Sequence, residues 1–224
     1  MSAPADVAPL RRNPAPDALA ETRVVAIFRR LSTAHAVMAA RALAQGGVRA
    51  VEITMDSDNA LDTLAALRES LGDDVAVGAG TVMDLRSARS AADAGACFFV
   101  SPHSDEALIR DIHALGIPYV PGAFTASEIV RAWNAGATAV KVFPSSTVGP
   151  RYIHDLLGPL RQIPLVPTGG ITPETAAGFM AAGAWAVGVG AQLVPVDLVE
   201  SGDEAALAAR AATLMEAVRA ARSA

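Results

Sequence analysis

The sequence predicts an α/β protein in which residues 15–224 form a single (β/α)8 barrel, the TIM-barrel architecture. Three observations support this prediction. A short apolar run, a turn and a segment with helical periodicity recur in order; the runs are apolar throughout; and most predicted helices end at a glycine that leads into the next run. Fully apolar strands indicate a parallel sheet covered by helices on both faces, and 224 residues suit one such barrel.

Eight strands are predicted, with helices between them. The clearest helix start is "ITPETAAGF", where Thr172 can cap the helix and Pro173 takes its first position. An open doubly wound sheet is the alternative, but "GAGTVM" and "GVGAQL" each supply only the first two glycines of a dinucleotide fingerprint. The predicted strands cover residues 23–28, 50–55, 75–80, 97–101, 118–122, 139–143, 164–168 and 186–190.

The two ends of the chain lie outside the repeated pattern. Residues 1–14 are rich in Ala and Pro, lack the features of a signal peptide and are expected to form a flexible tail. The segment "PAPDALAETR" that follows predicts a short N-terminal helix against the body. The C-terminal "DEAALAARAATLMEAVRAARSA" predicts an amphipathic helix with acids early and arginines late, as the helix dipole favours.

Composition and charge disfavour several classes of function. A net charge of -5 and a pI near 5.3 argue against a nucleic-acid partner. No apolar run approaches the roughly 20 residues needed to span a bilayer, so no membrane partner is expected. The single Cys97 cannot form an internal disulfide, which fits a reducing compartment. We therefore expect a soluble cytoplasmic protein.

Lys141 is the only lysine of the chain, and it lies in the apolar strand "AVKVF". An ammonium group is costly to bury, so two interpretations stay open. The side chain either reaches the rim of the sheet or pairs with a carboxylate, or it is an amine that must lose its proton, which arginine cannot do.

Glu52 is a second ionisable residue in a buried strand, "AVEITM". A structural ion pair between Glu52 and Lys141 is one interpretation, and catalysis is the other. Burial depresses the pKa of a lysine and leaves a free amine near neutral pH. A free amine attacks ketones, and a neighbouring carboxylate can then move protons.

Further polar residues and glycines follow the carboxyl ends of predicted strands, where barrels carry their chemistry. The glycines after the last two strands could cradle a phosphate, although tight turns without a ligand are the alternative. No His and carboxylate cluster has metal-ligand spacing, so a metal is not required. The candidate residues at these ends are Arg29, Thr54, Thr81, Ser101, Pro102, His103, Thr168, Gly169, Gly170 and the turn "GVGAQ".

Between about residues 23 and 195, the chain resembles the 2-keto-3-deoxy-6-phosphogluconate (KDPG) aldolases and the related 4-hydroxy-2-oxoglutarate and 6-phosphogalactonate aldolases. The motifs "GGVRAVEIT", "VGAGTV", "FVSPH", "VPGAFT", "VKVFP" and "PTGGI" occur in the family's order and spacing. The resemblance implies a metal-free class I aldolase on a (β/α)8 barrel, usually a homotrimer. It implies no cofactor beyond a covalent Schiff base on Lys141.

The same resemblance implies roles for individual residues. Lys141 matches the Schiff-base lysine, and Glu52 matches a general acid/base that works through a water molecule. The pyruvyl pocket is matched by Thr81, Pro102, Phe143 and Thr168, and the phosphate site by Gly169, Gly170 and the turn at Gly190.

Two residues depart from the family pattern. Asp56 stands where some KDPG aldolases carry an arginine for the substrate carboxylate, and Arg29, which resembles an arginine of other members, could take over that contact. Ala191 stands where several members carry a phosphate-binding serine. KDPG cleavage is the expected activity. Unphosphorylated 4-hydroxy-2-oxoglutarate, the galactonate epimer and a non-catalytic sugar-phosphate-binding barrel remain alternatives.

Overall fold

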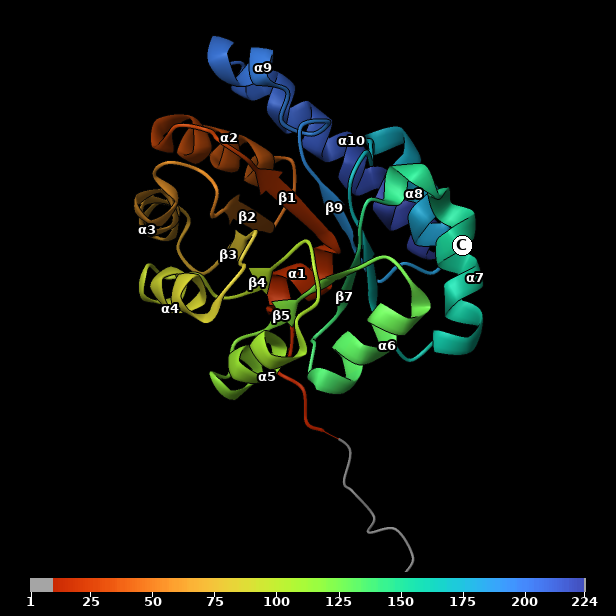
Figure 1. Cartoon of the computed structure of the whole chain (residues 1–224). Helices are drawn as coiled ribbons and strands as arrows, with labels where there is room; N and C mark the ends of the chain where they lie inside the picture. The colour runs from red at the N-terminus through yellow and green to blue at the C-terminus, as the bar shows by residue number, and fades with distance from the viewer. Residues whose placement is uncertain (1–9, 224) are drawn as a thin grey trace, which may run out of the picture.

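The structure, a computed structural model, describes residues 10–223 and has a curled sheet of parallel strands surrounded by helices (Figure 1). The order of strands and helices along the chain confirms the predicted α/β class. The strands are β1 Val24–Phe28, β2 Ala50–Thr54, β3 Ala76–Gly80, β4 Phe99–Val100, β5 Tyr119–Val120, β6 Gly122–Ala123, β7 Val140–Val142, β8 Leu165–Pro167 and β9 Val187–Val189.

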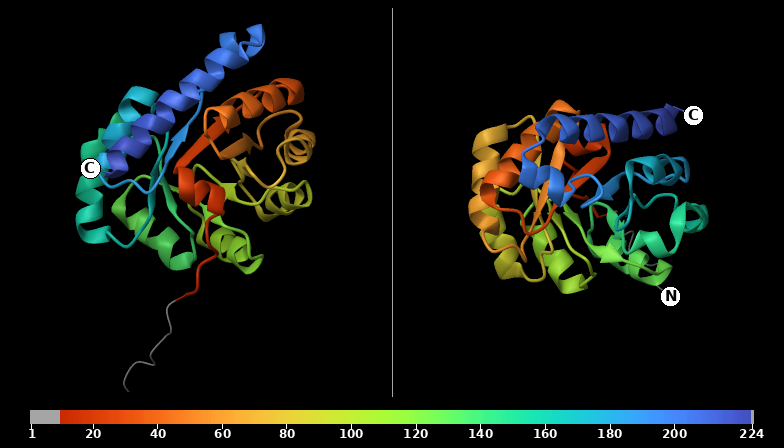
Figure 2. Two further views of the ribbon diagram at one scale, coloured as in Figure 1. Left: turned by 180° about the vertical axis from the view of Figure 1, so that it is seen from behind. Right: turned by 90° about the horizontal axis from the view of Figure 1, so that it is seen from above.

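Most of the helices connect successive strands and cover the outside of the sheet (Figure 2). Within the described residues, none of them is long and apolar enough to cross a membrane. They are α1 Asp17–Thr22, α2 Thr33–Gln45, α3 Ala60–Leu71, α4 Leu85–Asp93, α5 Glu106–Ala114, α6 Ala126–Ala135, α7 Gly149–Leu160, α8 Pro173–Ala181, α9 Val196–Ser201 and α10 Glu204–Ser223, with a short 3-10 helix at Ser145–Thr147.

The strand pairing forms two sheets. Six strands pair in the order β5-β4-β3-β2-β1-β9, and three in the order β6-β7-β8. The fifth predicted strand, 118–122, is split at Pro121, because proline has no N–H to donate to a ladder. The strands thus pair as two parallel sheets, linked between Thr168 and Gly188 by an isolated parallel bridge, and the single closed ring of eight strands stays a prediction.

Alternation along the strands creates two apolar cores. Side chains on one face of the strands pack against the surrounding helices, and those on the other face fill the inside of the curl. Leu19 of α1 is buried in the inner core beside Val25 and Phe98, and α1 lies over the centre of the sheet in the left view of Figure 2. The predicted short helix is thus confirmed, and it closes the amino end of the curl.

The residues just before α1 are attached to the body, which corrects the predicted tail of residues 1–14 at its end. The amide of Asn13 donates to the carbonyls of His113 and Ile117, and Arg12 stacks 3.3 Å from the ring centre of Trp133. Hydrogen bonds and stacking thus hold residues 11–13. The first nine residues lie outside the described part of the chain.

The predicted C-terminal helix is confirmed as α10, which packs against α8 and α2. Gly46, directly after α2, allows this packing. A methyl group there would collide with Ala211 and with the backbone of α10. The helix crosses the outer side of strands β9 and β1 in Figure 1.

Replacing Leu19 by Ala should destabilise the protein by about 2 to 5 kcal/mol, because the truncation leaves a cavity at the amino end of the inner core. Urea unfolding measures this loss. Leu61→Ala is the matched control, since Leu61 is 40% exposed on α3 and its truncation should change the free energy of unfolding by less than about 0.5 kcal/mol. Equal losses in both variants would contradict a buried role for α1.

Candidate active site

Lys141 lies in the middle of β7 with 7% of its surface exposed. Burial lowers the pKa of its amine, an effect that the charge of Glu52 opposes and that of Arg29 reinforces. The Nζ atom lies 4.9 Å from the ring centre of Phe143. Across residues 10–223, no hydrogen bond or ion pair to Nζ is found. The amine is therefore buried, and no hydrogen bond or ion pair within the described residues occupies it.

Glu52 lies in the middle of β2 with 2% of its surface exposed. Burial raises the pKa of its carboxyl group, although the charges of Lys141 and Arg29 act in the opposite direction. Gly80 at the end of β3 makes room for this group, because a side chain there would collide with Glu52 Oε1. Sequence reasoning missed this role of Gly80, although glycines in the strand "VAVGAG" were a usable signal.

The two buried groups do not form a close ion pair. In the described structure, Nζ of Lys141 and the carboxylate oxygens of Glu52 do not come within 4 Å of each other. Burial shifts both pKa values in the direction that favours the neutral form. A structural salt bridge would need good geometry and hydrogen bonds to offset the loss of hydration. The geometry favours a reactive amine beside a proton-transfer group over a structural pair.

A cavity of about 510 Å³ opens at the carboxyl ends of the strands, with Lys141 in its wall. It brings together the candidate residues predicted from the sequence, except Glu52, Thr54, Ser101 and His103. Gln192, the last residue of the predicted turn "GVGAQ", lines it too, and so do Ile27 and Ile171, which were not predicted. The predicted residues that line it with Lys141 are Arg29, Thr81, Pro102, Phe143, Thr168, Gly169, Gly170, Gly190 and Ala191.

Glu52 and Thr54 lie below and beside this cavity. Glu52 and Lys141 share a void of about 10 Å³ beneath it, inside the curl of the sheet. Thr54 is fully buried, and its hydroxyl lies 3.2 Å from that of Ser57. Thr54 was predicted to bind substrate, but the structure places it in a polar network behind the cavity wall.

The buried residues Ser145 and Thr168 fix the part of the cavity wall that follows β7 and β8. Ser145 donates to the carbonyl of Val142 at 2.7 Å and accepts from the backbone N–H of Thr168 at 3.2 Å. A side chain at Gly188 would lie 2.6 Å from Thr168 Oγ1, so this glycine makes room for the threonine. Ser101 is also buried, but it bonds to Tyr119 and to the carbonyl of His103 and does not line the cavity.

Backbone geometry at the cavity mouth requires glycine. Gly169 and Gly170 have φ angles of 94° and 70°, and they connect β8 to α8, whose first turn Thr172 caps. Peptide N–H groups at such a turn can bind an anion. Thr81 also has a positive φ, 57°, which is strained for a β-branched residue and is typical of functional positions.

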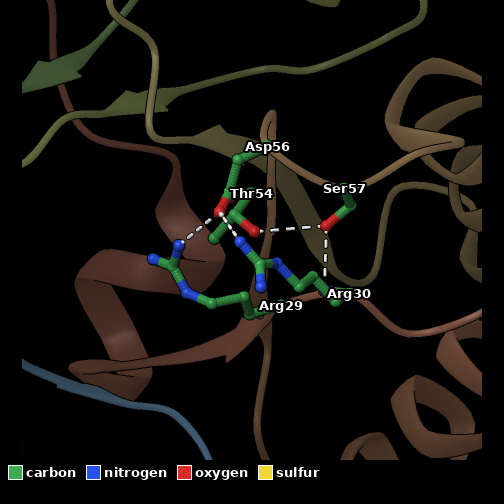
Figure 3. A network of polar contacts seen from close by, with 5 residues as sticks. All are labelled: Arg29, Arg30, Thr54, Asp56 and Ser57. Atoms are coloured by element: carbon green, nitrogen blue, oxygen red, sulfur yellow. Dashed lines mark hydrogen bonds and ion pairs between the residues drawn. The ribbon is translucent and has the colours of Figure 1, made fainter.

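Arg29 lines the same cavity and is held by a carboxylate (Figure 3). Its Nη1 donates to Asp56 Oδ2 at 2.7 Å. Arg29 and Lys141 are the ionisable residues that line the cavity. Among the described residues, no group of three or more His, Cys, Asp or Glu side chains could hold a metal ion.

Comparisons with known proteins agree with this geometry. Residues 16–210 match the family model described as KDPG and KHG aldolase. A KHG/KDPG aldolase of Escherichia coli is 35% identical over 170 residues, which cover 75% of this chain and 79% of the relative.

Two solved structures have the same fold. One, described as the native KDPGal structure, has a TM-score of 0.83 and 33% identity and covers 90% of this chain and 96% of its own. The other is KDPG aldolase from Legionella pneumophila with pyruvate captured as a covalent carbinolamine, with a TM-score of 0.78, 25% identity and coverage of 91% and 95%. This chain therefore belongs to the KDPG and KHG aldolase family and has the fold of a lyase of that family.

Proposed function

We propose that this protein is a metal-independent class I aldolase that cleaves KDPG to pyruvate and glyceraldehyde 3-phosphate through a Schiff base on Lys141. The observation that carries the proposal is the single lysine, buried in the cavity wall with a lowered pKa and no ion pair in the described structure. The carbinolamine that pyruvate forms in the Legionella relative supports the same chemistry.

The first half of the reaction forms the iminium. The neutral Nζ of Lys141 attacks the C2 ketone, and a proton moves to the ketone oxygen to give a carbinolamine. Glu52 supplies the next proton, and water leaves as the C=N bond forms. Burial raises the pKa of Glu52, which favours the protonated acid that this step uses.

The second half breaks the carbon–carbon bond. Glu52, now a carboxylate, removes the proton of the C4 hydroxyl through a water molecule. The C3–C4 bond breaks, its electrons move into the iminium, and the aldehyde leaves an enamine on Lys141. Protonation of the enamine at C3, followed by hydrolysis of the C=N bond, releases pyruvate and restores the amine.

The cavity suggests how the two ends of the substrate bind. The carboxylate at C1 is bonded to the carbon that Lys141 attacks, so the nearby Arg29 guanidinium is its natural partner. Thr81, Pro102, Phe143 and Thr168 surround the pyruvyl part. Backbone N–H groups at Gly169, Gly170 and Gly190 bind the distal phosphate at the other end of the cavity.

A specific observation favours a second substrate, 4-hydroxy-2-oxoglutarate. Ala191 lines the cavity without a hydroxyl group for phosphate, so an unphosphorylated keto acid fits the same site. The galactonate epimer of KDPG is a third candidate. Comparison of kcat/KM for the three compounds decides between them, and the highest value for KDPG is the expected result.

We further propose that residues 15–224 form one domain with a closed (β/α)8 barrel. Two connections support closure. Only Pro121 separates β5 from β6, and the bridge from Thr168 to Gly188 links β8 to β9. The family resemblance also supports a homotrimer, and the single Cys97 supports a cytoplasmic location. Light scattering would test the trimer by its mass.

Incubation with pyruvate and borohydride should attach a stable adduct to Lys141, which peptide mass spectrometry locates. Lys141→Arg is the matched control, because arginine is of similar length but cannot form a free amine, and it should give no adduct and no turnover. If the wild-type protein is folded but forms no adduct, the Schiff-base mechanism is contradicted and a sugar-phosphate-binding barrel is favoured.

Lys141→Met should raise the urea midpoint at pH 7, because it removes an amine that is costly to bury. The lowered pKa also sets the pH dependence. The unfolded chain binds a proton at Lys141 more readily than the folded protein does, so wild-type stability falls as pH falls below the ordinary value of 10.5. The advantage of the variant should therefore be larger at pH 7 than at pH 9. A structural ion pair predicts the opposite, a loss of about 3 to 5 kcal/mol.

Glu52→Gln should lower turnover by about 10²- to 10⁴-fold, because the amide keeps the size of the side chain beside Gly80 but transfers no proton. The pyruvate adduct on Lys141 should still form, only more slowly. Glu106→Gln, an exposed residue that pairs with Arg110 at 3.3 Å on α5, is the control and should leave turnover unchanged. Full activity of Glu52→Gln would remove this residue from the mechanism.

A further inference from the structure

A polar network lies at the carboxyl ends of β1 and β2 (Figure 3), and its member Arg29 lines the cavity. The two strands pair in parallel, with Phe28 opposite Ile53, so the residues that follow them meet at one edge of the sheet. Asp56 Oδ2 accepts from Arg29 at 2.7 Å and lies 3.7 Å from Nη2 of Arg30. One carboxylate oxygen therefore contacts two guanidinium groups.

The carboxylate of Asp56 is itself held in place. Burial acts to raise its pKa, but a hydrogen bond from Thr54 and the charge of Arg29 outweigh this and lower it. Ser57 accepts from the backbone N–H of Arg30 at 2.9 Å and contacts the Thr54 hydroxyl. The buried Thr54 thus anchors the network to β2, and Asp56 stays ionised at neutral pH.

Arg29 needs such a support. Its side chain is 52% exposed. In the described structure, its guanidinium donates a hydrogen bond to Asp56. A long exposed side chain without a partner samples many rotamers, and fixing it on substrate binding costs conformational entropy. A carboxylate that holds the guanidinium at the cavity wall removes part of this loss before the substrate arrives.

We propose that Asp56 is a positioning residue, which holds the Arg29 guanidinium at the cavity wall so that it binds the carboxylate of the keto acid. The inference rests on the proposed function, in which Lys141 attacks the carbon next to that carboxylate. Asp56 does not touch the substrate, and it acts through Arg29.

A positioning role and a purely electrostatic role of Asp56 predict opposite changes in binding, so they can be told apart by experiment. Asp56 is an anion near a site for an anion, so a purely electrostatic role predicts that its removal tightens binding. Positioning predicts that its removal weakens binding. Pyruvate is the probe, because the carboxylate is its only anionic group, and the readout is the pyruvate concentration that gives half-maximal borohydride trapping on Lys141.

Asp56→Ala should raise this concentration by about tenfold, while the maximal extent of trapping stays that of the wild type. The half-maximal concentration for Asp56→Asn should lie between those of the wild type and Asp56→Ala, because the amide oxygen still accepts one hydrogen bond from Arg29. Asp56→Glu should restore much of the affinity. In an Arg29→Ala background the same changes at Asp56 should have no further effect, since both act through one guanidinium.

Asp73→Asn is the matched control, because Asp73 pairs with Arg68 at 2.8 Å before β3, at the opposite end of the strands. It should leave trapping unchanged. An unchanged or lower half-maximal concentration in Asp56→Ala, or an equal loss in the Arg29→Ala background, overturns the positioning role. These results are distinct from failure of the proposed function, in which the wild-type protein itself gives no adduct with pyruvate.

Discussion

Burial of one amine inside the curl of a parallel sheet is the constraint on which the rest of the site depends. An ammonium group at Lys141 would lose its hydration without gaining an ion pair, so the low polarity around β7 favours the neutral form. The same surroundings favour the neutral acid at Glu52. Burial thus favours, in one place, the neutral amine that the proposed mechanism needs as a nucleophile and the neutral acid that it needs as a proton donor.

Glycines give these polar side chains their space. The inner face of a strand ordinarily carries Val, Ile or Leu, and a branched side chain at Gly80 or Gly188 would occupy the positions of the Glu52 carboxyl or the Thr168 hydroxyl. Gly78, two residues before Gly80 on β3, likewise leaves room for the ring of Phe98. The inner core thus becomes less apolar toward the carboxyl ends of the strands, where the cavity opens, and it remains tightly packed toward α1.

Charge is separated between the floor and the mouth of the cavity. The floor holds Lys141 and Glu52, whose neutral forms burial favours, whereas the mouth holds the partly exposed ion pair of Arg29 with Asp56, in which the pKa of Asp56 is lowered. The keto acid of the proposed reaction needs both environments, since its ketone reacts with a neutral amine and its carboxylate is best bound by a fixed cation. In the proposed function, the backbone turn at Gly169 and Gly170 binds the phosphate or the second carboxylate at the far end of the substrate.

The sequence by itself determined the α/β class, the short first helix and most residues of the cavity, because apolar runs, glycine stops and a lone buried lysine are local signals. It also indicated Glu52 as the partner of Lys141. Only the tertiary structure decided that Pro121 divides the fifth strand, since ladder pairing depends on neighbours distant in the chain. It also placed Thr54 behind the wall and joined Asp56 to Arg29, because these contacts arise where two strands end side by side, 27 residues apart.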